Sequence, residues 1–284
     1  MKNKNILVTG GSGFLGSHVA DYLSNLGYHV TIYDNKKSNW LKKNQKFING
    51  NIMDLKKLKK KIKKIDYIYH FAALSDLDNA LKNPLESIKV NILGTAKLLQ
   101  FAVENKIKRF IHASTIYVNS SQGSFYAASK KASEDYLREY SKLYNLKFTI
   151  LRFGSLYGKR ADHNNGLNKI INISKAKGRV IFSGNKKTVR EYINVKDAAK
   201  ACYKILRTKY ENEHVLITGK NKIKITSFLK FLKKKINSKK KIIIQNKKMI
   251  GHYIKTPYTS KFYKGKKIKL ESYSNFYDSL NEII

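Results

Sequence analysis

The stretch Thr9-Gly10-Gly11-Ser12-Gly13-Phe14-Leu15-Gly16 decides the fold of this chain. It follows a short apolar run, Asn5–Thr9, and opens a segment with helical periodicity that reaches Leu26. Glycines at such a turn let backbone N–H groups approach a pyrophosphate, whose charge then lies at the amino terminus of the helix. The alternative is a glycine turn without a ligand. Asp34 argues against it, because it ends the next apolar run, where a carboxylate can accept hydrogen bonds from a ribose.

Predicted strands and helices alternate through the first half of the chain, which is the pattern of βαβ units in a parallel sheet. Strands are expected at Asn5–Thr9, Tyr28–Tyr33, Lys46–Gly50, Tyr67–Phe71, Arg109–Ala113 and Lys147–Arg152. Helices are expected at Gly13–Leu26, Leu55–Lys64, Leu85–Asn105 and Ala127–Tyr144. The predicted fold class is therefore α/β, with a Rossmann-type doubly wound parallel sheet over residues 1–153.

Beyond Arg152 the alternation loosens, and residues 154–284 are expected to form mainly a smaller substrate-binding cap over the carboxyl ends of the strands. A loop is predicted over 154–166 and a helix over Leu167–Lys177. A strand at Val189–Val195 and a helix at Asp197–Leu206 are expected to return to the Rossmann domain.

The composition is that of a globular protein, with 284 residues, 42% hydrophobic and 12% aromatic side chains. No apolar run approaches the roughly 20 residues that cross a bilayer, and the first residues show no signal-peptide pattern. A cytoplasmic protein without membrane insertion is expected. The single cysteine, Cys202, excludes an intramolecular disulfide and a cysteine-cluster metal site, and the histidines are not at ligand spacing, so no metal is predicted.

The formal net charge of +39 raises the question of a nucleic-acid partner. The basic residues are mostly lysines spread through the whole chain rather than gathered in an arginine-rich arm. This distribution favours a general compositional bias, so a nucleic-acid partner is not expected. A positive field would favour an anionic substrate.

A second motif is Tyr126-Ala127-Ala128-Ser129-Lys130, whose Tyr and Lys share one helical face. In a chain with 19 tyrosines this spacing alone carries little information. It gains weight from Ser114-Thr115 at the end of the preceding strand, where a hydroxyl lies on the ligand side of such a fold. Tyrosine is a poor base at neutral pH unless a neighbouring ammonium favours its phenolate.

With these motifs in order, residues 5 to about 206 resemble the extended short-chain dehydrogenase/reductase family, and within it the NAD-dependent nucleotide-sugar epimerases and dehydratases. The resemblance implies NAD as the cofactor and a catalytic triad of Thr115, Tyr126 and Lys130. The cofactor contacts that it implies are Gly10, Gly13, Phe14, Leu15, Gly16, Asp34, Asp54, Ala72, Ala73, Asn91, Tyr126 and Lys130. The implied substrate contacts are Thr115, Ser155 and Arg190.

The resemblance also implies the chemistry. Tyr126, as a phenolate, would take a proton from a sugar hydroxyl while hydride passes to NAD; Lys130 would lower the tyrosine pKa, and Thr115 would hold the reacting oxygen. The expected reaction is C4 epimerisation of a nucleotide-diphosphate sugar through a transient ketosugar. Net dehydrogenation or ketoreduction is an alternative, and a non-catalytic nucleotide- or RNA-binding relative is a second one.

Departures from the family pattern leave the base and the sugar of the substrate open. The chain has Val118-Asn119-Ser120 where the family usually has Val-Tyr-Gly, and Ser155 where many relatives have asparagine. Relatives that eliminate water place an Asp-Glu pair after the catalytic threonine, whereas Ile116 and Tyr117 follow Thr115 here. A 4,6-dehydratase of the usual kind is therefore not expected.

Three further side chains have two interpretations each. Arg190 would contact a nucleotide phosphate, or else form an ion pair with Glu191 or another carboxylate. Tyr253 and Tyr258, which flank Pro257, would either line the cap or only pack within it.

A homodimer is expected, with the predicted helices Leu85–Asn105 and Ala127–Tyr144 paired against their symmetry mates. This rests on the family resemblance and on the apolar positions of the second helix, some of which exceed what one sheet face can cover. These positions are Ala132, Tyr136, Leu137, Tyr140 and Tyr144.

We predict that NAD binds more tightly than NADP. Asp34 can accept hydrogen bonds from ribose hydroxyls but would face a 2′-phosphate as a like charge. Titration of the protein with both cofactors measures the difference. Equal or tighter binding of NADP would mean that Lys36 and Lys37 outweigh Asp34.

Overall fold

The computed structural model describes residues 4–246, 251–254 and 265–284. Its centre is an eight-stranded sheet in the order β14-β11-β6-β5-β4-β1-β2-β3, and every neighbouring pair of strands is parallel. The strands are β1 (Asn5–Thr9), β2 (His29–Asp34), β3 (Gln45–Asn49), β4 (Tyr67–His70), β5 (Arg109–Thr115), β6 (Phe148–Phe153), β11 (Glu213–Ile217) and β14 (Lys266–Lys267). The predicted Rossmann-type doubly wound sheet is confirmed.

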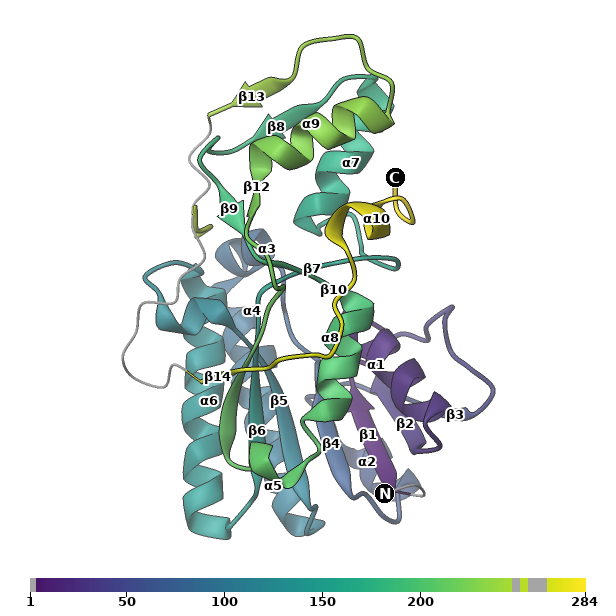
Figure 1. Ribbon diagram of the computed structural model, residues 1–284. Coiled ribbons are helices and arrows are strands. Elements are labelled where there is room, and N and C mark those ends of the chain that lie inside the picture. Colours follow the sequence, from purple (N-terminus) through teal and green to yellow (C-terminus); the bar gives the residue numbers. More distant parts are fainter. Residues whose placement is uncertain (1–3, 247–250, 255–264) are drawn as a thin grey trace.

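Helices cover both faces of this sheet (Figure 1). They include α1 (Phe14–Asn25), α2 (Lys56–Lys61), α5 (Gly94–Glu104), α6 (Ser124–Tyr144) and α8 (Val195–Lys204). Successive side chains of β1 point to opposite faces of the sheet, and both faces are covered by helices. Ile6 and Val8 belong to the core beneath α1 and α8, and Leu7 to the core beneath α2, α5 and α6. Both faces of the sheet are therefore buried, as parallel sheets require.

The helix predicted over Leu85–Asn105 is interrupted. It consists of α4 (Pro84–Ser87), a π-helical stretch (Ile88–Leu93) and α5. The wider turns carry Asn91, which is fully buried. A short helix that the sequence did not predict, α3 (Leu77–Lys82), precedes them, and the Asp76 side chain caps it by accepting from the N–H of Asn79.

A second group of elements packs around its own apolar core beyond the carboxyl ends of the strands, where Figure 1 shows it above the sheet. These elements are α7 (Gly166–Lys177), β8 (Ile181–Ser183), β9 (Val189–Arg190), β12 (Ile223–Lys224), α9 (Ile225–Lys235), β13 (Ile243–Gln245) and α10 (Phe276–Leu280). A paired strand couple, β7 (Ser155–Tyr157) and β10 (Tyr192–Asn194), connects them to the sheet domain. The predicted loop 154–166 therefore contains a strand.

The return to the sheet domain extends beyond the predicted 189–206. Helix α8 packs in the same core as α1, and β11 and β14 lengthen the main sheet at its β6 side. β14 has only two residues, which is too short a run for sequence periodicity to show.

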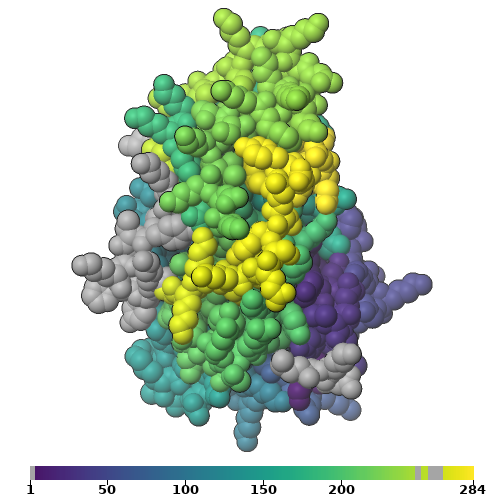
Figure 2. Space-filling view, in the orientation of Figure 1, coloured from purple at the N-terminus to yellow at the C-terminus, as the bar shows by residue number. Residues whose placement is uncertain are grey.

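The C-terminal segment joins the two parts. Figure 2 shows it, in yellow, crossing the surface from β14 to the cap. The Asp197 carboxylate of α8 accepts from the N–H of Ser274, and Glu282 pairs with Lys196. No helix in the described ranges is both long enough and apolar enough to cross a membrane.

Candidate active site

A cavity of about 1580 Å³ lies at the carboxyl ends of the central strands, between the sheet and the cap. All predicted site residues line it except Asp54 and Asn91. The lining members of the predicted set are Gly10, Gly13, Phe14, Leu15, Gly16, Asp34, Ala72, Ala73, Thr115, Tyr126, Lys130, Ser155 and Arg190. Residues from distant parts of the sequence thus meet in one cavity.

The glycine turn after β1 forms one end of the cavity. Gly10 has φ +70°, and a Cβ on it would lie 2.5 Å from the backbone nitrogen of Ala72. A Cβ on Gly16 would overlap the carbonyl oxygen of Gly10. No side chain caps the start of α1 at Gly13, so the first N–H groups of this helix are directed toward the cavity as a site for an anion.

Asp34, at the end of β2, stands beside this turn. Its carboxylate accepts from the backbone N–H of Ser12 at 3.0 Å and of Lys36 at 3.2 Å. A carboxylate fixed next to an open helix start is the arrangement that fits the ribose and pyrophosphate of a dinucleotide. The residues present therefore fit NAD.

Two predicted cofactor contacts lie outside the cavity. The Asp54 carboxylate accepts from the N–H of Lys56 at the start of α2, and it is Asn51, Ile52 and Met53 that line the wall instead. The Asn91 side chain is buried and forms its hydrogen bonds within the fold.

The amide of Asn91 links the loop after β4 to helix α6. Its oxygen accepts from the N–H of Leu74 at 2.8 Å, and its nitrogen donates to the Ser129 hydroxyl at 2.9 Å. Asn91 therefore acts on the cavity through the position of other residues.

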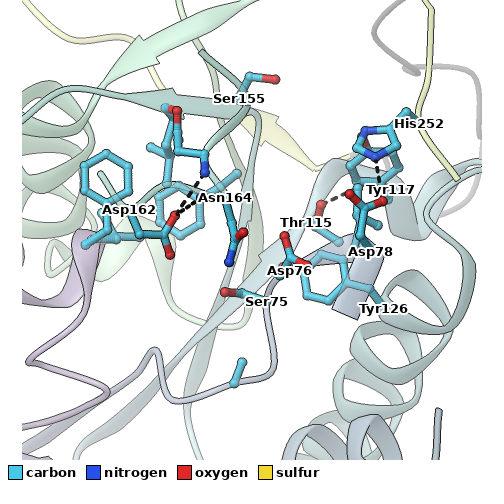
Figure 3. Close-up of a pocket in the computed structure, with 18 of the residues that line it drawn as sticks. Ser75, Asp76, Asp78, Thr115, Tyr117, Tyr126, Ser155, Asp162, Asn164 and His252 are labelled. Carbon is cyan, nitrogen blue, oxygen red and sulfur yellow. Dashed lines mark hydrogen bonds and ion pairs between the residues drawn. The ribbon is translucent and has the colours of Figure 1, made fainter. Parts of the chain in front are cut away.

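The three predicted catalytic residues come from neighbouring elements. Thr115 ends β5, and Tyr126 and Lys130 lie in the first two turns of α6. Figure 3 shows Thr115 and Tyr126 facing the same part of the cavity, close to Asp76. Lys130 is only 2% exposed.

Burial controls the protonation of this group. It lowers the pKa of Lys130 to about 8, against the opposing effect of Glu134. Tyr126 is partly exposed, but its hydroxyl lies within the cavity, and this desolvation, with a smaller contribution from Tyr117, raises its pKa. In the protein alone, desolvation of the phenolate dominates the pKa of Tyr126, so the lowering expected from Lys130 does not set the direction of the shift. At neutral pH Tyr126 keeps its proton.

Arg190 is a cation held on an aromatic surface. Its guanidinium lies 4.2 Å from the centre of the Tyr253 ring and donates to the Tyr253 carbonyl at 3.2 Å. In the described ranges no carboxylate pairs with it; Glu191 instead accepts from Lys267 and from Thr218. The predicted alternative of an Arg190–Glu191 ion pair is therefore wrong, and the charge of Arg190 faces the cavity.

The sequence missed several residues of the cavity wall. The Tyr253 ring contacts that of Tyr117 at 4.9 Å, and its hydroxyl is 3.0 Å from the hydroxyl of Ser155. Tyr253 is buried and lines the cavity, so it has both of the suggested roles, whereas Tyr258 lies outside the described residues.

Asp76, Asp78 and His252 also line the cavity, and His252 Nε2 lies 3.6 Å from an Asp78 oxygen (Figure 3). The two aspartates follow β4 at the carboxyl edge of the sheet, where ligands bind in such folds, so their position in the sequence could have indicated that they line the site. His252 comes from a segment without any motif. Among the described residues, no three His, Cys, Asp or Glu side chains are grouped as a metal site would require.

The glycine turn, the Asp34 carboxylate beside it and the Thr-Tyr-Lys group are the features expected of an NAD-dependent enzyme of the Rossmann class. The model of the NAD dependent epimerase/dehydratase family matches residues 6–218, and the chain belongs to this family of extended short-chain dehydrogenases/reductases. NAD is its cofactor.

Curated relatives carry two different activities. A putative UDP-glucose 4-epimerase of Methanocaldococcus jannaschii is 32% identical over 76% of this chain and 77% of its own length. A dTDP-D-glucose 4,6-dehydratase of Dictyostelium discoideum is 31% identical over 71% of this chain, but the match spans only 55% of that protein.

Solved structures show the same overall arrangement. A UDP-N-acetylglucosamine 4-epimerase of Methanobrevibacter ruminantium, in complex with UDP-N-acetylmuramic acid, has a TM-score of 0.84 and 26% identity, covering 100% of this chain and 97% of its own. A UDP-glucose 4-epimerase of Thermotoga maritima, with UDP-glucose, has a TM-score of 0.81 and 29% identity, covering 89% and 88%.

We predict that Tyr126→Phe lowers turnover by about 10²- to 10⁴-fold, because only the hydroxyl that exchanges a proton is removed. The dissociation constant of NAD should change little. Steady-state kinetics and calorimetric titration measure the two effects, with Tyr144→Phe, on the exposed end of the same helix, as the control. A Tyr126→Phe variant with a near-normal rate would show that this tyrosine has no catalytic role.

Proposed function

We propose that this protein catalyses C4 epimerisation of a nucleotide-diphosphate sugar through a transient ketosugar. The observation that carries the proposal is the continuity of the cavity. It runs from the glycine turn, past Thr115 and Tyr126, to Arg190 and the cap. One ligand end can therefore lie beside the cofactor site while a diphosphate lies beside the cationic side chain.

Tyr126, Thr115 and Arg190 each have a distinct task in this reaction. Tyr126 exchanges a proton with the sugar hydroxyl, and the Thr115 hydroxyl holds the same oxygen by a hydrogen bond. Arg190 holds the diphosphate, so that binding energy far from the reacting carbon positions that carbon. NAD, when bound, supplies the acceptor and later the donor of a hydride, together with a positive charge that favours the phenolate of Tyr126.

The return of the hydride to the other sugar face requires room for the ketosugar to turn. A cavity of about 1580 Å³ is larger than the range of about 300–1,000 Å³ that is usual for small-molecule sites. It has space for a bulky nucleotide sugar beside the cofactor. The similarity to two 4-epimerases of known structure supports the same reaction.

Dehydration is the main competing reaction, because 4,6-dehydratases are among the relatives. It needs an acid and a base beside the sugar, and relatives that eliminate water carry an Asp-Glu pair for this directly after the catalytic threonine. Ile116 is apolar and buried, and burial raises the pKa of Tyr117 to about 12, which keeps its phenol neutral. Neither residue after Thr115 can serve as a carboxylate acid or base.

We predict that UDP-hexoses incubated with the protein and catalytic NAD form the C4 epimer, without accumulation of NADH and without loss of mass. Proton NMR of the sugar ring and mass spectrometry measure the products. Stoichiometric NADH would instead indicate a dehydrogenase. Loss of one water from the sugar would indicate a dehydratase and place acid and base groups elsewhere in the cavity.

We further propose that the protein works as a homodimer. Apolar side chains of α4, the π-helical stretch and α6 lie exposed: Leu85 is 78% exposed, Ile88 52%, Tyr136 50% and Tyr144 56%. Leu137, one of the apolar positions of α6, is fully buried in the core of its own chain. A second copy of the chain would cover the exposed set.

The expected mass in light scattering at micromolar concentration is that of two chains. The double variant Ile88→Lys/Tyr136→Lys should be monomeric, because it introduces like charges at the centre of this surface. Trp40→Lys, which changes an equally exposed aromatic residue on the β2–β3 loop, is the matched control. A monomeric native protein would contradict the proposal.

A further inference from the structure

A buried carboxylate lies one helical turn beyond Lys130. Glu134 of α6 is 1% exposed, and its Oε1 accepts from the Ser114 hydroxyl at 2.6 Å and from Arg152 Nε at 3.0 Å. Its Oε2 accepts from Arg152 Nη2 at 2.6 Å. Glu134 therefore joins the helix of Tyr126 and Lys130 to β5 and β6.

The position of these bonds matters more than their number. Ser114 directly precedes Thr115, so the bond to Glu134 fixes the end of β5 against α6. Strand β5 and helix α6 together supply the three proposed catalytic residues: Thr115 ends β5, and Tyr126 and Lys130 lie on α6. A shift between them would separate the hydroxyls that must hold one substrate oxygen.

Stability alone does not account for such a group. Arg152 is also 2% exposed, and a fully buried ion pair seldom stabilises a fold more than well-packed apolar residues of the same volume. Its desolvation cost is offset by the hydroxyl and the two guanidinium bonds. The pair is therefore expected to have a role that apolar residues cannot fill.

We propose that Glu134 is a positioning residue of the active site, which holds Thr115 in register with Tyr126 and presents a negative charge to the Lys130 ammonium. This inference rests on the proposed function, in which Thr115, Tyr126 and Lys130 act together.

The groups around Lys130 explain why one carboxylate has this influence. Burial lowers the pKa of Lys130, and Glu134 opposes this. His70 of β4 and His112 of β5 are fully buried, and burial together with Lys130 lowers the pKa of both, that of His70 to about 3, so both are neutral at physiological pH. Asn91 of the π-helical stretch carries no charge.

On the far side of Glu134 lie three further titratable groups. Arg152 of β6 forms the ion pair, Arg138 of α6 lies 3.6 Å from Oε2, and His214 of β11 lies 4.0 Å from it. Burial lowers the pKa of His214 to about 4, so this imidazole adds no charge at neutral pH. Removal of the charge of Glu134 would leave Lys130 among neutral groups and cations, and its ammonium should lose its proton more easily.

The test measures the titration of Lys130 without reference to turnover. The full-length protein is acylated competitively between pH 6 and 10, and mass spectrometry of the peptide that contains Lys130 gives the fraction of neutral amine. We expect Glu134→Gln to move the midpoint of Lys130 down by half a pH unit or more. Glu139→Gln, which removes an exposed carboxylate of the same helix that pairs with Lys142, should leave it unchanged.

Kinetics test the positioning role. Glu134→Gln should lower kcat roughly tenfold, with KM nearly unchanged and the alkaline limb of the pH profile shifted to lower pH. Ser114→Ala keeps the Glu134–Arg152 pair and removes only its link to β5, so kcat should fall while the titration of Lys130 stays in place. Glu139→Gln should match the native protein in both.

Two results would overturn the inference. One is a folded Glu134→Gln variant, with native NAD binding, in which Lys130 titrates as in the native protein. The other is a Ser114→Ala variant with native kcat; if Glu134→Gln does not fold, this variant decides the question. A native protein that turns over no nucleotide sugar would instead refute the proposed function, and the titration of Lys130 would still test the charge effect.

Discussion

The contact between two glycines of one turn is the constraint on which the rest of this structure depends. Gly16 approaches the carbonyl of Gly10 so closely that no side chain fits between them, and Gly10 approaches the loop after β4 in the same way. Helix α1 can therefore start directly above the sheet edge, with its N–H groups uncapped by any side chain. A methyl group at either position would move the helix away from the loop that carries Ala72 and close the dinucleotide site.

The opposite end of the cavity depends on α6. This helix begins at Gly123, where φ is +94° and a Cβ would collide with Tyr117 and Ala127. Its first turns carry Tyr126 and Lys130, which are proposed to be catalytic. Its second and third turns carry the buried polar groups that fix it, Ser129 toward Asn91 and Glu134 toward β5 and β6. Helix α6 thus carries both the side chains that would contact the substrate and the buried groups that hold it against β5 and β6. A movement of the helix relative to the sheet would therefore displace both sets of side chains.

The sequence predicted those parts of the site whose residues are neighbours along the chain. The turn from Gly10 to Gly16, Asp34 at a strand end, and Tyr126 with Lys130 on one helical face are local patterns, and the structure places all of them in the cavity. Asp54 does not line the cavity, and a motif position does not reveal that its carboxylate accepts from the backbone N–H of Lys56 instead.

Properties that depend on tertiary packing were beyond the sequence. The raised pKa of Tyr126 follows from desolvation in the assembled cavity, and the role of Tyr253 follows from a segment that crosses to Arg190 and Ser155. The apolar positions of α6 could not be divided between core and surface, because helical periodicity does not reveal which element packs against a face; Leu137 lies in the core. In each case the missing information was the identity of distant neighbours.

The two outer strands of the sheet give the lysine-rich composition a physical use. An edge strand exposes unpaired N–H and C=O groups that can pair with another chain. Here β14 at one edge consists of two exposed lysines, and β3 at the other carries exposed Lys46. A second molecule that approached either edge would have to desolvate these ammonium groups, or break the ion pairs of Lys266 with Glu213 and of Lys267 with Glu191, before any backbone bond formed. In a protein of net charge +39, this cost opposes edge-to-edge association of two sheets.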